Sequence, residues 1–249
     1  MKTIRQGAIV DESACIEDNV EIGYNSVVLS GAEGASVTRI MQGAVVGSNC
    51  TIYEGVRIGQ QAKVLSGSVV KQSVPSLAIV EGNPANIVGY VNTKFHVEDV
   101  RDYPHEVGGI ATSLKGVKLF NFPNIPDLRG NLTVGEFEKQ IPFVPRRYFI
   151  VYGVPTAETR GEHAHVRCHQ FLIALSGSIN VIADDGANRE EFILNRNNLG
   201  LYLPAMTWGI QYRYSRDAVL LVFASEFYDP QDYIRDYETF IAMSRAPAA

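Results

Sequence analysis

The sequence predicts an all-β protein with two unlike parts, a short solenoid of stacked parallel strands followed by an antiparallel double-sheet barrel. Three observations support this prediction. Aliphatic residues recur at every sixth position through the first seventy residues. From about residue 115 onward, short strand-like segments alternate with turn residues. No long amphipathic helical pattern interrupts them before Asp229–Ala242, which argues against a helical or α/β class.

Composition narrows the class of protein. The 249 residues include 22 basic and 27 acidic side chains, which gives a formal net charge of −5, and no basic stripe occurs in the sequence. This charge distribution argues against nucleic-acid binding. No apolar run reaches the roughly 18 residues of a membrane span, and the N-terminus lacks a signal-peptide pattern. Cys15, Cys50 and Cys168 are odd in number and far apart, which indicates reduced thiols. We therefore expect a cytoplasmic protein that binds neither nucleic acid nor membrane.

The solenoid prediction depends on the six-residue period. Between Ile4 and Val70, eleven of the twelve positions in this register are Ile or Val, and Gly34 is the exception. A fixed short period signals a solenoid. Six residues per face fit a prism with three flat faces, so twelve hexads predict four turns without an insertion. Glycine often follows the aliphatic residue, as at Gly23 and Gly47, where we expect corners with positive φ.

This period resembles the left-handed parallel β-helix of hexapeptide-repeat acyltransferases. The segment Ser73–Ala85, with Ser-Val-Pro and Gly-Asn-Pro-Ala, is similar to the closing turn of that family. The resemblance implies a left-handed coil over residues 1–92, a trimer, and acetyl-CoA as a ligand of this domain. Many members carry a catalytic histidine, often beside a loop that breaks the repeat. Here no histidine precedes His96, which favours an assembly role over acetyl transfer.

Residues 93–112 lose the period and gather turn residues, so they are interpreted as a linker in which His96 and His105 are solvated or capping residues. Residues 113–245 form the second domain, in which many short strands with turns between them predict a double-sheet barrel or jelly roll. The expected strands are Val117–Asn121, Leu132–Glu138, Tyr148–Tyr152, Phe171–Leu175, Ile179–Ala183, Glu191–Leu194, Gly200–Leu203, Trp208–Tyr212 and Val219–Ser225.

Three of the five histidines lie within seven residues, at His163, His165 and His169. On a strand, His163 and His165 point the same way, because side chains alternate between faces. Imidazole titrates near neutrality and can take and return a proton. Together with Arg160 at the strand's entry, the pair suits proton transfer next to a carbonyl, where an arginine or tyrosine stabilises the enolate oxygen. The alternative is a buried histidine pair with satisfied hydrogen bonds.

His-x-His after a glycine, then a hydrophobic strand, a Gly-Ser turn and a later proline, is cupin-like. Cupins often bind a metal through His-x-His, an acidic residue three or four positions on, and a distant histidine. His169 stands where the acidic ligand would be, and Gly200–Gly209 contains no histidine. Because so few ligands make a poor closed site, we expect no metal.

A closer resemblance joins motifs across the second domain. They are Arg146-Arg-Tyr148, Arg160-Gly-Glu-His-Ala-His165, His169-Gln-Phe-Leu-Ile173, Gly200-Leu-Tyr202, Pro204-Ala-Met-Thr-Trp208, Val219–Asp229 and Asp232-Tyr-Ile-Arg-Asp-Tyr237. Together they resemble the cupin-type nucleotide-sugar 3,4-ketoisomerases, the WxcM-like C-terminal domain. Some members of that family are fused to an N-terminal hexapeptide-repeat domain. Gly209 departs from several single-domain relatives, which have histidine there.

The resemblance implies isomerisation of a dTDP-linked 4-keto-6-deoxyhexose through an enediolate, without a cofactor. His163 would shuttle the carbon-bound proton between C3 and C4, and His165 would handle the oxygen-bound proton or steady its partner. Tyr148 and Arg160 would contact the sugar and the developing oxyanion or the diphosphate. The remaining residues expected to bind substrate or line its pocket are His169, Tyr202 and Trp208; ordinary barrel core is the alternative for the last two.

Two other functions stay open at this point. The β-helix could also acetylate an amino sugar, which would make the chain bifunctional, or the barrel could be a sugar-binding cupin without catalysis. The leading expectation is a ketoisomerase of deoxy-amino-sugar biosynthesis for surface polysaccharide. The β-helix implies a threefold axis and the cupin domain implies pairing through swapped strands, so we expect a trimer or a hexamer. The configuration at C4 of the product, galacto or gluco, is not fixed by these residue types.

Overall fold

The computed structural model describes residues 1–31, 37–92, 103, 105–156 and 158–245. The chain divides into two compact units, Met1–Phe95 and His96–Ala249. Among the described residues, none of the helices combines the length and apolar character that crossing a bilayer requires.

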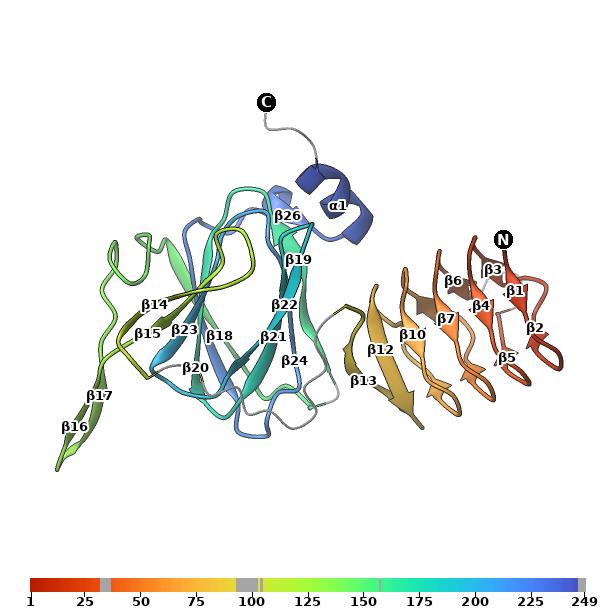
Figure 1. The fold of residues 1–249 in the computed structure, drawn as a ribbon, viewed down its shortest axis with the longest axis horizontal. Helices are drawn as coiled ribbons and strands as arrows, with labels where there is room; N and C mark the ends of the chain where they lie inside the picture. Colours follow the sequence, from red (N-terminus) through yellow and green to blue (C-terminus); the bar gives the residue numbers. More distant parts are fainter. Residues whose placement is uncertain (32–36, 93–102, 104, 157, 246–249) are drawn as a thin grey trace. The chain divides into compact units, whose positions relative to one another are not determined.

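The first unit is a coil of short parallel strands arranged on three faces (Figure 1). One face carries β1, β4, β7, β10 and β12, the second carries β2, β5, β8 and β11, and the third carries β3, β6 and β9. The two-residue strands are β1 (Thr3–Ile4), β2 (Ile9–Val10), β3 (Cys15–Ile16), β4 (Glu21–Ile22), β5 (Val27–Val28), β6 (Arg39–Ile40), β7 (Val45–Val46), β8 (Thr51–Ile52), β9 (Arg57–Ile58), β10 (Lys63–Val64) and β11 (Val69–Val70). The three-sided parallel coil is thus confirmed, and its left hand stays a prediction.

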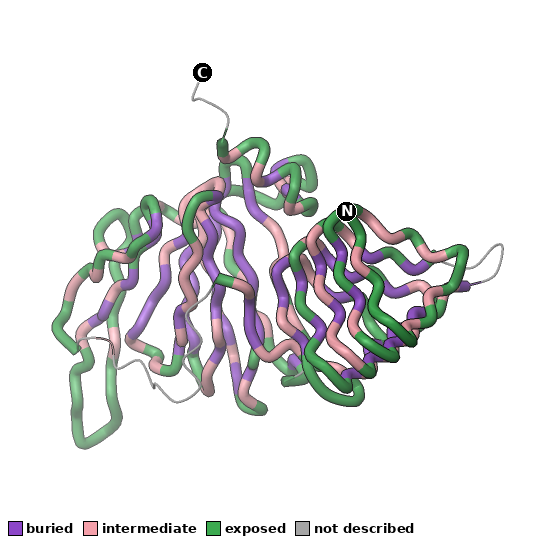
Figure 2. The backbone as a smooth tube through the Cα atoms, turned by 45° about the vertical axis from the view of Figure 1, so that its right-hand side comes forward, coloured by how far each residue is buried: buried purple, intermediate pink, exposed green. Residues whose placement is uncertain are grey.

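The repeat positions form the core of this coil. Ile22, Ile40 and Ile52 are fully buried, and the small residues two positions earlier, such as Ala44 and Ala62, are buried as well. Figure 2 shows buried positions recurring along the coil, one in each two-residue strand from β4 to β11, whereas the N-terminal strands β1 to β3 have none. At the C-terminal end, β12 (Ala78–Gly82) pairs with the antiparallel strand β13 (Ala85–Tyr90) and closes the stack.

The expectation of an uninterrupted register from residue 4 to 70 is wrong. Ile4 pairs with Ile22, a spacing of 18 residues, but Ile16 pairs with Ile40, a spacing of 24. Six additional residues therefore lie between β5 and β6, in the hexad that contains Gly34. An insertion of one whole hexad leaves the six-residue period in phase, so the period alone did not reveal it. One argument against acetyl transfer, the unbroken repeat, is thereby removed.

The interpretation of the corner glycines is also wrong. Gly23 and Gly47 do not have positive φ; left-handed positions fall instead on residues such as Gly43 and Asn49. A Cβ on Gly23 would lie 2.5 Å from the carbonyl carbon of Gly47, and one on Gly47 would lie 2.7 Å from the backbone nitrogen of Ser66. Glycine is required there because successive turns of the coil touch backbone to backbone.

The second unit consists of two antiparallel sheets facing each other, the cupin jelly roll that the sequence predicts (Figure 1). The six-stranded sheet has the order β14-β15-β23-β20-β25-β18, and the five-stranded sheet has the order β22-β21-β24-β19-β26. Their strands are β14 (Gly108–Ala111), β15 (Lys118–Asn121), β18 (Arg147–Tyr152), β19 (Arg160–His165), β20 (Gln170–Ser176), β21 (Ile179–Asp184), β22 (Arg189–Leu194), β23 (Leu199–Leu203), β24 (Trp208–Tyr212), β25 (Val219–Ala224) and β26 (Tyr233–Ile234).

The core lies between the two sheets. Leu172, Val181, Phe192, Leu201 and Leu220 are fully buried members of one apolar cluster drawn from both sheets. The burial of these side chains, about 25 cal/mol per Å² of apolar surface, is the main force that holds the sheets together. Because this packing is rigid, it fixes the strands that carry the histidines.

Three elements differ from expectation. Strand β14 lies inside the segment interpreted as linker and pairs with β15, so the second unit's sheet begins earlier than residue 113. The strand expected at Leu132–Glu138 is β17 (Gly130–Thr133), which forms a separate two-stranded hairpin with β16 (Asn124–Asp127). The helix expected from Asp229 begins later, as α1 (Tyr237–Arg245); before it come the 3₁₀ turn η1 (Pro230–Asp232) and β26.

A buried ion pair anchors α1 to the five-stranded sheet. Arg189 Nη2 donates to Asp184 Oδ2 at 2.6 Å, and the two side chains are only 7% and 5% exposed. The Tyr237 hydroxyl of α1 donates to the same carboxylate oxygen at 2.7 Å. Trp208 packs edge-on against Tyr237, with ring centroids 5.2 Å apart. The sheet therefore holds Tyr237, the first residue of α1, by hydrogen bonds to the ion pair and by its contact with the Trp208 ring.

Replacing Arg189 by Met should destabilise the second unit by about 3–5 kcal/mol, because it leaves a buried carboxylate without its cation. Trp208 is the chain's single tryptophan, so urea unfolding followed by its fluorescence reports on this region. Arg216→Met, at an exposed arginine, is the matched control and should shift the free energy of unfolding by less than about 0.5 kcal/mol. Equal midpoints for the two variants would contradict the anchoring role.

Candidate active site

A β-bulge in β19 sets the direction of the central histidines. Gly161 and Glu162 both have positive φ, 82° and 55°, and the pairing with β24 shifts register between Gly161 and His163. A Cβ at residue 161 would lie 2.6 Å from the carbonyl oxygen of Gly209, so only glycine fits. Bulges re-aim side chains. After this one, the strand continues with His163 and His165 on one side.

The structure brings His163 and His165 together, as the sequence predicts. Their ring centroids lie 4.9 Å apart and the rings meet edge to face. His165 is buried, with 4% of its surface exposed, whereas His163 is half-buried. The two imidazoles therefore share one face of the sheet but have different access to solvent.

His163 keeps one nitrogen available. Its Nδ1 lies 2.9 Å from the carbonyl oxygen of Gly161, an acceptor only, so Nδ1 carries the proton and donates it there. Nε2 is then unprotonated, and no hydrogen bond to it occurs among the described residues. The bulge thus fixes the tautomer of His163 and leaves Nε2 as a base.

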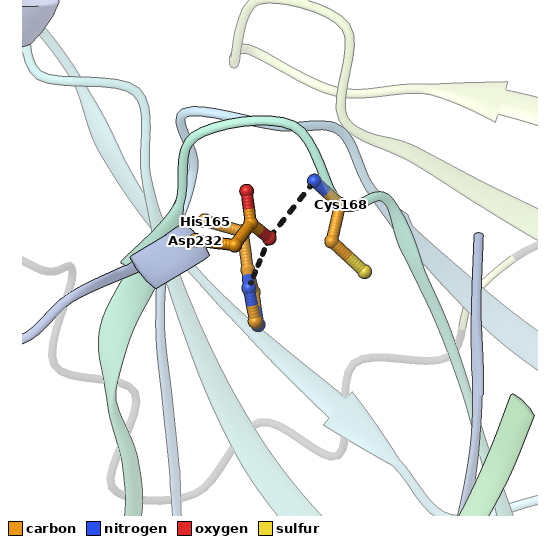
Figure 3. Close-up of side chains that lie close together, drawn as sticks. All are labelled: His165, Cys168 and Asp232. Atoms are coloured by element: carbon orange, nitrogen blue, oxygen red, sulfur yellow. Dashed lines mark hydrogen bonds and ion pairs between the residues drawn. The ribbon is translucent and has the colours of Figure 1, made fainter. Parts of the chain in front are cut away.

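His165 has both nitrogens engaged. Nδ1 donates to Asp232 Oδ2 at 2.9 Å, and Gln170 Nε2 donates to His165 Nε2 at 3.1 Å. Asp232 is itself buried and accepts two backbone N–H groups, from Arg167 at 2.8 Å and from Cys168 at 3.3 Å. Figure 3 shows the carboxylate between the His165 ring and the Cys168 amide. Asp232 therefore fixes the tautomer and the orientation of His165.

The electrostatics keep both imidazoles neutral. Burial lowers the pKa of His163 below the ordinary 6.5, and Arg235 and Arg147 lower it further, against the opposing effect of the Gly161 carbonyl. Burial, followed by the neighbouring His163, lowers the pKa of His165 to about 4 in spite of Asp232. The contact between His165 and Asp232 is thus a hydrogen bond from a neutral imidazole to a carboxylate near pH 7.

Tyr233 and two arginines complete the group around the histidines. The Tyr233 ring lies 4.9 Å from that of His163 and 4.3 Å from that of His165. Arg147 Nη2 donates to the Tyr233 hydroxyl at 3.4 Å, and the Arg235 guanidinium lies 4.5 Å from the Tyr233 ring centroid. Strand pairing sets this arrangement, because Tyr233 on β26 is directly opposite His165 on β19.

Two residues expected in the site lie elsewhere. Tyr148 is 66% exposed on the outer side of β18, while its neighbour Arg147 points to Tyr233. Arg160 is exposed, and among the described residues no hydrogen bond or ion pair links it to either histidine; its charge instead opposes the rise that burial causes in the pKa of Tyr214. Arg160 is the first residue of β19 and pairs with Gln211, before the bulge that precedes His163.

The other expected residues fall into two groups. The Tyr202 hydroxyl lies 2.7 Å from His169 Nδ1 with their rings stacked, which forms a polar pair beside Phe143. Trp208 is 5% exposed and packs on Tyr237 and Phe240, so it is core beneath α1. Outside the barrel, His105 is exposed and accepts from Arg196, while His96 lies outside the described residues.

The three histidines do not converge on one point as metal ligands. His165 has both nitrogens bonded, and His169 Nδ1 is paired with Tyr202. Among the described residues, the grouping that could hold a cation is His165, Cys168 and Asp232, whose ligand atoms lie within 4.8 Å of one another. Hydrogen bonds from three N–H groups already occupy that carboxylate. The donor set therefore does not fit the metal site of a cupin, and the expectation of no metal stays a prediction.

Arg147, Asp232, Tyr233 and Arg235 were not assigned to the site from the sequence. The signal for three of them was present, because Asp232-Tyr-Ile-Arg belongs to a motif of the resemblance. The sequence pattern predicts a helix for that segment, which would place it on the surface. The sequence does not show that Arg147 faces the site, because Arg146, Arg147 and Tyr148 are consecutive and alternation alone does not tell which of them points inward.

Comparisons with known proteins identify the family of the second unit. The FdtA family, described as WxcM-like, C-terminal, matches residues 115–245. A TDP-4-oxo-6-deoxy-alpha-D-glucose-3,4-oxoisomerase of Aneurinibacillus thermoaerophilus is 41% identical over 123 residues, which cover 49% of this chain and 88% of the relative.

Two solved structures show the same domain. A 3,4-ketoisomerase from Helicobacter canadensis is 39% identical, with a TM-score of 0.51 over 53% of this chain and 98% of that one. A histidine-to-asparagine variant of the 3,4-ketoisomerase QdtA from Thermoanaerobacterium thermosaccharolyticum, in complex with TDP-4-keto-6-deoxyglucose, is 36% identical, with a TM-score of 0.51 over 53% of this chain and 96% of that one. The family match extends over more than half of the chain, so the protein belongs to the FdtA family (WxcM-like, C-terminal) through the domain that carries His163 and His165.

Proposed function

We propose that this protein is a sugar-nucleotide 3,4-ketoisomerase, which converts a TDP-linked 4-keto-6-deoxyhexose into its 3-keto isomer. The observation that supports this proposal most strongly is that the two histidines differ in their hydrogen bonding. His163 has an unprotonated Nε2 without a partner among the described residues, whereas His165 has both nitrogens bonded. One poised base beside a fixed polar partner is what proton abstraction next to a carbonyl requires.

The proposed chemistry is a proton transfer without net oxidation or reduction. His163 Nε2 removes the proton from C3, which is acidic because C4 is a carbonyl carbon, and an enediolate forms. The same imidazolium returns the proton to C4, which leaves the ketone at C3. Because one carbon is oxidised as its neighbour is reduced, the reaction needs no external redox cofactor.

Cationic groups next to the base support the negative charge of this intermediate. Arg147 donates to the Tyr233 hydroxyl and Arg235 lies over the Tyr233 ring, which is itself next to His163, so both bring positive charge to the side of the base. Arg147 is further held by Nε, which donates to the carbonyl oxygen of Glu226 at 3.2 Å. Fixed positive charge of this kind stabilises a developing oxyanion or a diphosphate. We assign to Arg147 and Arg235 the role that the sequence suggested for Arg160.

His169 and Tyr202 remain candidates for binding the substrate, because their polar pair lies half-buried near the start of β20. The positions of Tyr148, Arg160 and Trp208 give no support to a binding role in this unit. The first unit remains proposed as an assembly element of a trimer or hexamer. The 3-keto product is the type of substrate that an aminotransferase needs, which supports a place in amino-sugar synthesis.

The rate should depend on pH through His163. The base is active when neutral, and its pKa is lowered from 6.5. The midpoint of the acid limb of kcat/KM should therefore lie below pH 6.5. A pH–rate profile between pH 4.5 and 8 measures this, and an acid limb with its midpoint above 6.5 would contradict the assignment.

The function itself is tested by incubating the full-length protein with TDP-4-keto-6-deoxyglucose and following the sugar by proton NMR. We expect the substrate's C3 proton signal to be replaced by the C4 proton signal of a 3-keto sugar. Binding of TDP without any product would instead support the sugar-binding alternative. Acetylation of an amino-sugar product by acetyl-CoA is the corresponding test of the bifunctional alternative.

A further inference from the structure

The proposed isomerisation requires two proton transfers, and His163 accounts for only one. The carbon-bound proton moves from C3 to C4, but the hydroxyl proton of O3 must also leave while O4 gains one. From the sequence, His165 was a candidate for this second transfer. Its environment argues against that role, because Asp232 and Gln170 occupy both of its nitrogens and its pKa is lowered to about 4.

Tyr233 lies next to both histidines. Its ring touches both imidazoles, with centroids 4.9 Å from His163 and 4.3 Å from His165. Two constraints hold it there: β26 pairs with β19, and the preceding residue, Asp232, is tied to His165 and to two backbone amides. The phenol is therefore as well fixed as the base.

The hydrogen bonding of Tyr233 leaves its proton available. Arginine is only a donor, so in the contact with Arg147 Nη2 the phenol oxygen is the acceptor. No acceptor for the Tyr233 O–H occurs among the described residues. The proton of this hydroxyl thus has no partner in the described structure, while the Arg147 guanidinium faces its oxygen.

We propose that Tyr233 is a further catalytic residue, which exchanges the hydroxyl protons of the sugar while His163 moves the carbon-bound proton. The inference rests on the proposed function. His163 first takes the proton of C3, and the electron pair of the C3–H bond forms a C3=C4 double bond. The π electrons of the C4 carbonyl move to O4, and Tyr233 gives its proton to O4. The Tyr233 phenolate then takes the proton of O3, and the electron pair of the O3–H bond forms the C3 carbonyl. The electrons of the C3=C4 double bond form a new C4–H bond with the proton that His163 returns. Both residues return to their starting states.

The test uses Tyr233→Phe in the full-length protein, with the 4-keto substrate in D2O. Two rates are measured by NMR, the formation of the 3-keto product and the entry of deuterium at C3 of the remaining substrate. Because His163 is intact, exchange at C3 should continue at a reduced rate. Product formation should fall by about 10²- to 10⁴-fold, so the ratio of exchange to product should rise at least about tenfold.

Tyr228→Phe is the matched control. Tyr228 is 61% exposed and its ring lies 5.8 Å from that of Tyr233, so it loses the same atom beside the site. It should keep both rates within about twofold. TDP binding and the melting temperature of Tyr233→Phe should match those of the wild type, because only the long contact to Arg147 is lost.

An equal fall of exchange and product in Tyr233→Phe would overturn the proposal, since it indicates a purely structural role. An unchanged rate of product formation would overturn it as well. Failure of the proposed function is a distinct result, because the wild-type protein itself would then show neither exchange nor product.

Discussion

His163→Asn should lower kcat/KM for the 4-keto sugar nucleotide by about 10³- to 10⁴-fold, because asparagine has no nitrogen that can accept the C3 proton. The amide can still donate to the Gly161 carbonyl, which His163 Nδ1 contacts at 2.9 Å. The strand bulge should therefore persist and the affinity for TDP should remain nearly unchanged. Turnover and TDP binding, measured on the same preparation, separate these two effects.

The matched control is His105→Asn, the same change at an exposed histidine outside the barrel. It should leave kcat/KM within about twofold of the wild type. Normal turnover of His163→Asn would remove His163 from its role as the carbon base. A loss of TDP binding in parallel with turnover would show that His163 acts in binding instead.

The second large effect is expected for Asp232→Asn. This change replaces the acceptor of His165 Nδ1–H, and it puts an amide where a carboxylate accepts from the backbone of Arg167 and Cys168. His165 is then free to change tautomer and to turn, and Tyr233, the next residue, moves with it. A displacement of about 1 Å in such a site costs about 10² in rate, so kcat should fall by about that factor.

Asp232→Asn should also lower the melting temperature, because at least one buried N–H group loses a charged acceptor worth about 1.5–3 kcal/mol. Asp217→Asn, at an exposed aspartate on the loop before β25, is the control and should change neither quantity. If kcat stays at the wild-type level while the melting temperature falls, Asp232 is an anchor for the fold alone.

The fold was largely predictable because both parts have strong local patterns. The six-residue period places Ile22 and Ile52 in the core, as observed, and the turn residues separate the strands of the barrel. The inserted hexad around Gly34 was not predictable. A periodic signal measures phase, and an insertion equal to the period leaves the phase unchanged.

The site was predictable where its residues are close in sequence. His163 and His165 lie two positions apart on one strand, so their common face follows from alternation. Asp232 and Tyr233 lie more than sixty residues away and reach the histidines only through the pairing of β26 with β19. A strand of two residues has almost no recognisable sequence pattern. Strand β26 is also followed directly by the helical pattern of α1, so the sequence does not predict it.

Strand parity explains the remaining errors. Arg147 and Tyr148 are adjacent on β18, and only the packing of the sheet decides that Arg147 points to the histidines and Tyr148 to the exterior. Arg160 is near His163 in sequence, but a β-bulge lies between them, so simple alternation does not give their relative direction. Neither the edge position of β18 nor the bulge of β19 is visible without the partner strands.

The most direct test of the single-base account follows deuterium in wild-type protein and His163→Asn, each incubated with TDP-4-keto-6-deoxyglucose in D2O. Whenever the proton held by His163 exchanges with D2O before it is returned, the account predicts deuterium at C3 of recovered substrate and at C4 of the 3-keto product for the wild type. It predicts neither label for the variant. Deuterium incorporation by His163→Asn at the wild-type rate would contradict it.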